Sequence, residues 1–275
     1  VMPECAPRLH TEDITVCLTQ ALNESGLTLD DIDAFAVTRG PGLIGCLHVG
    51  LQAAKTLAML YKKPLIPVHH LAGHIYANEY AGEFHFPLLC VVVSGGNTEL
   101  VIMKDHMDFT IVGETKDDAV GECYDKVARV LGLPYPGGLP IDQHAKLGTH
   151  SYHLPVPASP DGKYDFSYSG LKTSVINLVN SLKMKGTPVS VDDMARSFQD
   201  VAIGMIVEKS LMAAKDFNVK QVILAGGVSA NSCTTDSAAM VAKVAEKLYE
   251  MKVFAPLNLG VDPNWKIDHW MDFKN

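Results

Sequence analysis

Residues 32–60 read IDAFAVTRGPGLIGCLHVGLQAAKTLAML, and this stretch decides the fold class. Ile32 to Thr38 is an apolar run typical of a buried strand, and the turn Arg39-Gly40-Pro41-Gly42 ends it. A helix is expected from about Leu43 to Leu60, followed by a short strand at Pro64 to Val68. Strand, glycine turn, helix and strand in this order indicate an α/β protein whose helices cover a sheet.

The same periodicity predicts further elements on both sides of this stretch. Upstream, VMPECAPRLH is expected to be a loop, and residues 11–25 form an amphipathic helix whose stripe is Ile14, Cys17, Leu18, Ala21 and Leu22. Downstream, a hairpin-like set of strands from Phe86 predicts a second sheet. The remaining segments are helices at about 118–131, 170–183 and 191–217, a Pro/Gly-rich loop at 133–169, and a buried strand at Gln221 to Ala225.

Composition excludes several classes of protein. With 47% apolar residues the chain can bury a core, and the numbers of Gly (22) and Cys (6) exclude collagen-like and disulfide-dense chains. No apolar run approaches the roughly 20 residues that span a bilayer, and no secretory signal opens the chain, so a cytoplasmic protein is expected. The net charge of −8 would repel a polyanion, so a nucleic acid must meet a local basic patch or another subunit.

His70 and His74 are four residues apart and therefore share one helix face, where they could bind one metal ion. A pair of structural histidines explains this spacing about equally well. The zincin protease motif needs Glu after the first His, and Leu71 stands there, so protease chemistry is disfavoured. A metal would also need a carboxylate, for which Asp236 is one candidate, although Asp236 also resembles the N-cap of a small-residue helix.

Three glycine turns follow predicted strands, at residues 40–42, 94–98 and 226–229. Each exposes backbone amides that can approach a phosphate, although strand turns use glycine routinely. None fits the P-loop, because Cys46 stands where a lysine is required. Together they suggest a nucleotide held between two sheets, by analogy with the actin and sugar-kinase group. Asp125 and Asp142 could then accept hydrogen bonds from ribose hydroxyls, although acidic residues at a helix start are common without a ligand.

Five ordered motifs cover nearly the whole chain. They are HHLAGH (69–74), VSGGNTEL (93–100), DDAVGECYDKVARVLGLPYPGG (117–138), YDFSYSGLKT (164–173) and GGVSAN (226–231). With them the chain closely resembles the universal tRNA threonylcarbamoyladenosine transferase family, formerly called O-sialoglycoprotein endopeptidase. The chain departs from the family pattern in lacking its first strand and a nucleotide-site loop, and in a shorter segment between Ser232 and Cys233.

The resemblance implies an actin-like (ASKHA, RNase H-like) two-lobed fold with a nucleotide and metal site between the lobes. The expected lobes are residues 1–90 with 237–262 and residues 91–236, followed by a tail at 263–275. The implied activity is transfer of the threonylcarbamoyl group from threonylcarbamoyl-AMP to N6 of adenosine 37 in tRNAs that read codons beginning with A. This reaction forms N6-threonylcarbamoyladenosine.

The resemblance also implies the site residues. The expected ligands of one divalent metal, Fe²⁺ or Zn²⁺, are His70, His74 and Asp236. The residues expected to hold the adenylate, or ATP or ADP in the same place, are Val93, Ser94, Gly95, Gly96, Asn97, Asp125, Gly138, Asp142 and Asn231. The chain does not indicate a general base.

Expected partners are tRNA, a paralogous dimerisation subunit, a small P-loop ATPase and an upstream adenylate-forming enzyme, with a homodimer left open and no membrane. The helix at 11–25 could dock a partner, although its stripe is better explained as core. The alternatives are an ATP-dependent kinase of the same fold, a non-catalytic paralogous scaffold and, least favoured, a metallopeptidase.

Overall fold

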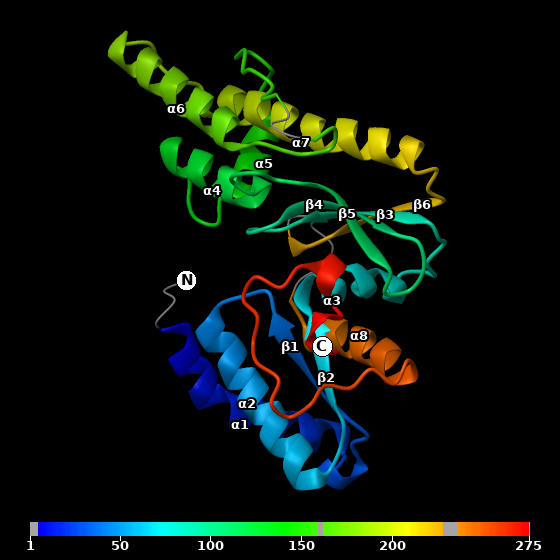
Figure 1. Cartoon of the computed structure of the whole chain (residues 1–275). Coiled ribbons are helices and arrows are strands. Elements are labelled where there is room, and N and C mark those ends of the chain that lie inside the picture. Colours follow the sequence, from blue (N-terminus) through cyan, green and yellow to red (C-terminus); the bar gives the residue numbers. More distant parts are fainter. Residues whose placement is uncertain (1–4, 159–161, 228–235, 275) are drawn as a thin grey trace. The chain divides into compact units, whose positions relative to one another are not determined.

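The computed structural model describes residues 5–158, 162–227 and 236–274, which form two compact units (Figure 1). Unit 1 comprises Val1–Ala81 and Asp236–Asn275, and unit 2 comprises Gly82–Thr235. The division near residue 82 lies several residues before the expected one, and the expected tail belongs to unit 1. Unit 2 is therefore one continuous stretch inserted between the two parts of unit 1.

Unit 1 is built on a pair of parallel strands. β1 (Phe35–Gly40) pairs with β2 (Leu65–His69), with Phe35 opposite Leu65, and α2 (Ile44–Tyr61) connects them. Figure 1 shows both strands between α2 and α8 (Ala238–Glu250). The predicted strand, turn, helix and strand are thus confirmed, with bounds shifted by one to three residues.

Helix α1 (Ala6–Ser25) begins earlier than predicted, because part of the expected loop VMPECAPRLH is helical from Ala6 onward. Pro7 lies in its first turn, where a missing N–H costs nothing. Although α1 packs along α2, it buries no residue fully. Ile14, Leu18 and Leu22 are half-buried, whereas the other stripe residues are exposed. Interpretation of this stripe as ordinary core is therefore wrong. The short helix η1 (Leu29–Asp31) follows, and Thr28 and Asp31 form a capping box at its start.

The C-terminal segment of unit 1 packs over the carboxyl ends of β1 and β2. It contains η5 (Ile267–His269) and η6 (Asp272–Lys274). The guanidinium carbon of Arg39 lies 4.5 Å from the centroid of the buried Trp265 ring, and Arg39 Nε donates to the Gly260 carbonyl at 3.0 Å. At Gly40 a Cβ would lie 1.8 Å from the Asp262 carbonyl oxygen, so only glycine allows this approach.

Unit 2 contains a four-stranded mixed sheet. Its strands are β3 (Leu88–Val93), β4 (Thr98–Met103), β5 (Phe109–Glu114) and β6 (Gln221–Ala225). The order is β5-β4-β3-β6, in which β3, β4 and β5 are antiparallel neighbours and β6 runs parallel to β3. The predicted second sheet is confirmed. The expectation that residues 221–225 form a buried strand holds only in part, because Val222 and Leu224 of β6 are exposed.

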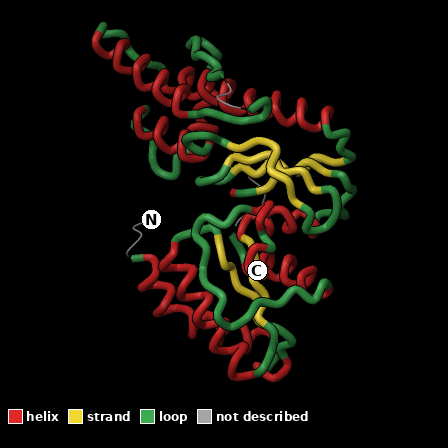
Figure 2. Tube along the Cα trace, in the orientation of Figure 1, coloured by secondary structure: helices red, strands yellow, loops and turns green. Residues whose placement is uncertain are grey.

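The helices of unit 2 lie on one face of this sheet (Figure 2). They are α4 (Val120–Val130), α5 (Gly138–Leu147), α6 (Ser169–Met184) and α7 (Val191–Asp216). The helix expected at 191–217 is confirmed as α7. Its apolar face is buried and consists of Met194, Ala195, Phe198, Val201, Ala202, Met205 and Ile206. The loop expected at 133–169 is wrong in part, because α5 lies inside it. Ile141 and Ala145 are one helical turn apart and buried, a period that the Pro/Gly content of the stretch obscured.

Two further observations concern the described ranges. No helix there is both long and apolar enough to cross a bilayer. The five described cysteines are free, and Cys90 and Cys123 are buried. Burial raises the pKa of the Cys123 thiol to about 12, which makes this cysteine chemically inert at neutral pH.

Candidate functional site

The two histidines of the HxxxH pair come together at the end of β2. The parallel strand ends at His69, and α3 (His70–Tyr76) starts at the next residue. One helical turn separates His70 from His74, so both rings lie on the same side of α3, with centroids 4.6 Å apart. The His74 ring is almost fully buried, whereas the His70 side chain is 27% exposed.

Asp236 lies against both histidines and completes the group. Its Oδ1 is 3.1 Å from His74 Nε2 and 3.6 Å from His70 Nε2, and the two Nε2 atoms are 3.2 Å apart. All three residues belong to unit 1. The structure therefore brings together the three residues that the sequence nominated, across a long separation in the chain.

The interpretation of Asp236 as an N-cap is wrong. α8 is capped by Ser237, whose hydroxyl accepts a hydrogen bond from the Met240 amide at 3.4 Å. The Asp236 side chain therefore has no capping role and is 75% exposed. An exposed carboxylate can be solvated by water and does not need a protein partner. The position of Asp236 beside two histidines therefore supports a ligand site more strongly than the spacing of the residues in the sequence does.

The electrostatics favour the metal-binding protonation states of His70 and Asp236. Burial, followed by the neighbouring His74, lowers the pKa of His70, which favours the neutral imidazole at pH 7. The hydrogen bond with His74 lowers the pKa of Asp236, which stays ionised. Neutral imidazole and ionised carboxylate are the forms in which these side chains coordinate a cation.

The geometry fits a metal ion of the size of Zn²⁺ or Fe²⁺. Two ligands at about 2.0–2.1 Å from a tetrahedral metal lie about 3.3 Å apart. The three observed separations between Nε2 and Oδ1 atoms, 3.1–3.6 Å, bracket that value. Two histidines and one carboxylate leave coordination positions open, as catalytic rather than structural sites do.

The glycine turn after β3, Ser94 to Asn97, is closed by its own hydrogen bonds. The Asn97 amide donates to Ser94 Oγ at 3.0 Å, and the Ser94 amide donates to the Asn97 carbonyl at 2.9 Å. A Cβ at Gly95 or Gly96 would meet no atom within 4 Å, so the outer side of the turn is open. Val93 ends β3 directly before it.

Helix α4 begins against this turn. A Cβ at Gly121, in the first turn of α4, would lie 2.7 Å from the Ser94 carbonyl oxygen and 2.9 Å from the Gly95 Cα. The amide of Val120, also in that first turn, donates to Thr98 Oγ1 at 2.9 Å. The positive end of the helix dipole thus lies beside an open glycine turn, an arrangement that favours an anion.

Asp125 already has a structural role. Its Oδ1 accepts a hydrogen bond from the Gly137 amide at 2.6 Å, which ties α4 to the residue before α5. Gly138, the first residue of α5, has open space where a Cβ would lie. Asp142, one turn further, accepts hydrogen bonds from Lys146 Nζ at 2.6 Å and Gln199 Nε2 at 3.2 Å. The structure thus joins Asp125, Gly138 and Asp142 in the α4–α5 pair. Asn231 lies outside the described residues.

The sequence did not identify two carboxylates that connect α4 to α6. Asp117 accepts hydrogen bonds from both the hydroxyl and amide groups at the start of α6, namely Ser167 Oγ, Tyr168 N, Ser169 N and Ser169 Oγ. Asp118 accepts from Lys126 at 2.9 Å and Lys172 at 2.6 Å. The sequence contains Asp117-Asp118 in one family-like motif and Ser167-Tyr168-Ser169 in another. Nothing in the sequence indicated that these two segments contact each other, as they do in the structure.

Solved structures with similar folds define the class of this protein. The HypF of T. kodakarensis superimposes with a TM-score of 0.52 at 15% identity, over 90% of this chain and 41% of that one. Full-length HypF in a phosphate- and nucleotide-bound form gives the same TM-score at 13% identity, over 82% of this chain and 37% of that one. The chain therefore has an actin-like fold of two α/β units, with a two-histidine, one-carboxylate centre in unit 1.

Sequence comparison gives the family. The sequence profile for tRNA N6-adenosine threonylcarbamoyltransferase matches residues 1–263. A protein of that description from Listeria welshimeri is 55% identical over 231 residues, which cover 84% of this chain and 67% of the relative. Another, from Bacillus thuringiensis, is 48% identical over an alignment 292 positions long, which covers 98% of this chain and 85% of the relative. This chain belongs to the tRNA N6-adenosine threonylcarbamoyltransferase family.

Proposed function

We propose that this chain transfers the threonylcarbamoyl group from threonylcarbamoyl-AMP to N6 of adenosine 37 in tRNAs that read codons beginning with A. Membership of the family and the names of its relatives support the reaction class. The observation that carries the proposal is the convergence of His70, His74 and Asp236 on one point. A kinase of the same fold would have no use for this group.

The reaction has a simple balance of bonds. The exocyclic amine of adenine attacks the carbamoyl carbonyl carbon, and a C–N bond forms while the bond from that carbon to the AMP phosphate oxygen breaks. AMP leaves with the electron pair, and the amine loses one proton to the surroundings. Because the mixed anhydride is already activated, the protein contributes mainly orientation and charge stabilisation, and no covalent protein intermediate is needed.

The side chains of unit 1 would hold a divalent cation, Fe²⁺ or Zn²⁺. His70 and His74 would supply their Nε2 atoms, and Asp236 would supply an anionic oxygen. Such a cation would supply Lewis-acid charge to a substrate oxygen when bound. The buried His74 ring keeps one side of the group free of water, and the exposed Asp236 side leaves room for a substrate.

The residues of unit 2 would hold the adenylate. The open turn Ser94 to Asn97, beside the first turn of α4, offers amides to the phosphate. Asp125 has a second carboxylate oxygen beyond the one that the Gly137 amide occupies, and an ionised carboxylate accepts at both oxygens. Asp125 and Asp142 would accept hydrogen bonds from the ribose hydroxyls, with Gly138 close to the ligand. ATP or ADP would occupy the same place.

Partner proteins are part of this proposal. A net charge of −8 opposes tRNA binding by the chain alone. The expected partners are a paralogous subunit, a small P-loop ATPase and an adenylate-forming enzyme, acting in the cytoplasm where tRNA is found. Helix α1, which exposes Leu9 and Val16 by 56% and 64%, is the surface that we assign to the paralogous subunit.

The test is transfer of labelled threonine into tRNA. With preformed threonylcarbamoyl-AMP, we expect the purified chain alone to give little product and the chain with its partners to give multiple turnovers. The control is the same mixture without this chain. Partners that make the modified nucleoside without it would contradict the catalytic role, and full turnover by the chain alone would contradict the need for partners.

A further inference from the structure

The three proposed metal ligands come from two segments of unit 1 that are far apart in the sequence. His70 and His74 belong to α3, whereas Asp236 precedes α8 by two residues. Because the Asp236 side chain is largely exposed, packing around it does not fix its position. The distance from its carboxylate to the two rings must therefore depend on how α8 is held against α3 and the short helix η2 (Ala77–Tyr80) that follows it.

We infer that Tyr80 is a positioning residue for the metal centre, because its hydrogen bond to the first turn of α8 holds Asp236 within ligand distance of the two histidines. Tyr80 Oη donates to the Ala239 carbonyl oxygen at 3.0 Å. Ala239 lies three residues after Asp236, within one helical turn. A carbonyl oxygen has two lone pairs, so this one can accept the tyrosine hydroxyl and also its helical partner.

A second contact reinforces the first one turn further along α8. Lys243 Nζ is 2.9 Å from Glu246 Oε2 and 3.8 Å from Glu79 Oε2, and it lies 6.0 Å from the centroid of the Tyr80 ring. Consecutive residues of η2, Glu79 and Tyr80, thus contact α8 at two points separated by one turn. Two points along a helix fix its rotation as well as its distance.

The first turn of α8 also packs closely against α3. A Cβ at Gly73, between the two histidines in α3, would lie 3.2 Å from Met240 Cγ and 3.3 Å from Met240 Cε. Met240 is buried, and its amide donates to the Ser237 cap. The first turn of α8 therefore lies between a close contact with α3 and the hydrogen bond from Tyr80, directly after the residue that supplies the carboxylate.

A metal site is sensitive to this restraint. Bond lengths at a bound metal vary by only about 0.2 Å, so a small displacement of α8 weakens the contribution of Asp236. Tyr80 itself is 56% exposed, and removal of its hydroxyl leaves no buried group without a partner except one lone pair of a helical carbonyl. We therefore expect Tyr80→Phe to weaken zinc binding by about 2- to 10-fold, at most the value of one hydrogen bond, while the metal-free protein is only slightly less stable and still melts cooperatively.

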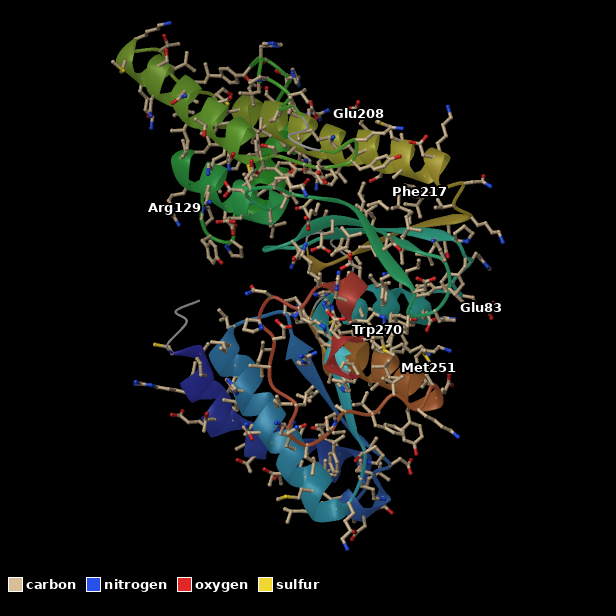
Figure 3. The ribbon with its side chains drawn as sticks, viewed as in Figure 1. Glu83, Arg129, Glu208, Phe217, Met251 and Trp270 are labelled. Atoms are coloured by element: carbon tan, nitrogen blue, oxygen red, sulfur yellow. The ribbon has the colours of Figure 1, made fainter. Side chains whose placement is uncertain are left out.

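Tyr249→Phe is the matched control. It makes the same change on α8, ten residues and about 15 Å along the helix from Ala239. Tyr249 lies two residues before Met251, which Figure 3 labels. Zinc affinity is measured on the full chain by competition with a chromophoric chelator, and metal-free melting curves are recorded for each variant. We expect Tyr249→Phe to bind zinc as the unaltered chain does.

A double-mutant cycle separates positioning from a general effect on the fold. If Tyr80 acts through Asp236, Tyr80→Phe should have no further effect on zinc affinity in the Asp236→Ala background. An equal loss in both backgrounds, no loss in the unaltered background, or loss of cooperative metal-free melting with Tyr80→Phe but not with Tyr249→Phe would overturn the inference.

This inference rests on the proposed metal centre, and one further variant distinguishes the two failures. His70→Ala should weaken zinc binding strongly. If it does not, the centre is wrong and the role of Tyr80 falls with it. If His70→Ala weakens binding while Tyr80→Phe leaves it unchanged, only the positioning role is overturned.

Discussion

The candidate site residues of the two units differ in whether their side chains also stabilise the fold. In unit 1 the exposed Asp236 has no capping role, and its oxygen points at two histidines. In unit 2 Asp125 holds the Gly137 amide and Asp142 pairs with Lys146, so both carboxylates contribute to the fold. Asp236 has no role in capping a helix, so its position beside two histidines points directly to ligand binding. Asp125 and Asp142 stabilise the fold, so a role in ligand binding can be assigned to them only if substitutions change ligand affinity and stability by different amounts.

The largest effect is expected from His74→Ala. Loss of a ligand should lower zinc affinity by more than about 100-fold, since even residues that only support ligands cost 10- to 100-fold, and tRNA modification should be abolished. The metal-free variant should still melt cooperatively, because the apolar core of unit 1 is unchanged. Zinc titration, threonine transfer and calorimetric melting measure these three quantities.

His48→Ala, at an exposed position on α2, is the control for His74→Ala and should leave all three quantities unchanged. If His74→Ala prevented cooperative folding in metal-free protein, the histidines would be structural, and the contrast between the two units would disappear. Normal turnover by His74→Ala at limiting metal would show that the cluster has no part in the reaction.

A smaller effect, about 10- to 100-fold on adenylate or ATP affinity, is expected from Asp125→Asn. Asparagine retains an oxygen that can accept from the Gly137 amide, but it loses the negative charge that favours ribose hydroxyls. Asp125→Ala should lose both, so it should weaken binding similarly and also lower the melting temperature. Isothermal calorimetry and melting curves distinguish these outcomes.

If both Asp125 variants bound the nucleotide as the unaltered chain does, Asp125 would be structural only. Unit 1 would then have carboxylate and histidine side chains that serve a ligand, whereas Asp125 in unit 2 would serve only to connect α4 to α5.

The smallest effect is expected from Asp117→Asn, which tests a carboxylate with a purely structural role. Burial acts to raise its pKa, but the hydrogen bonds from Ser167, Ser169 and the Tyr168 amide outweigh burial and leave the pKa below its usual value. The charged form therefore stabilises the fold above the unfolded pKa of about 3.9, and this contribution is lost as pH falls through the lower folded pKa.

At pH 7 we expect Asp117→Asn to be less stable by about 1 kcal/mol, a value typical of helix caps, and the difference should narrow below pH 4. Denaturant unfolding at several pH values measures it. Glu208→Gln, on the exposed face of α7 (Figure 3), is the control. Lost nucleotide binding by Asp117→Asn with unchanged stability would contradict the structural assignment.

The periodic elements of the fold could be predicted from the sequence. The strand and helix at 35–61 and the buried face of α7 follow from apolar spacing alone. The errors fall where local composition conflicts with tertiary contacts. α5 begins in a Pro/Gly-rich stretch because Asp125 holds the amide of Gly137, a bond between positions distant in sequence. α1 begins at Ala6 because proline suits a first helical turn.

The metal group could be nominated from the sequence but not assembled from it. HxxxH fixes the geometry of His70 and His74 through the helix period, yet nothing local indicates which carboxylate meets them. The N-cap preference of aspartate pointed to a different role for Asp236, and only the position of Ser237 excludes it. The Tyr80 contact with Ala239 joins positions far apart in the chain, and no pattern in the sequence predicts it.

The insertion of unit 2 within unit 1 has a consequence for synthesis on the ribosome. Unit 2 is one continuous stretch and can fold as soon as it emerges, whereas the two strands of unit 1 wait for α8 and the segment that packs on Gly40. His70 and His74 are made before unit 2, and they meet Asp236 only after all of unit 2 has been translated. A nascent chain cut short at the end of unit 2 would therefore carry the histidine pair without Asp236.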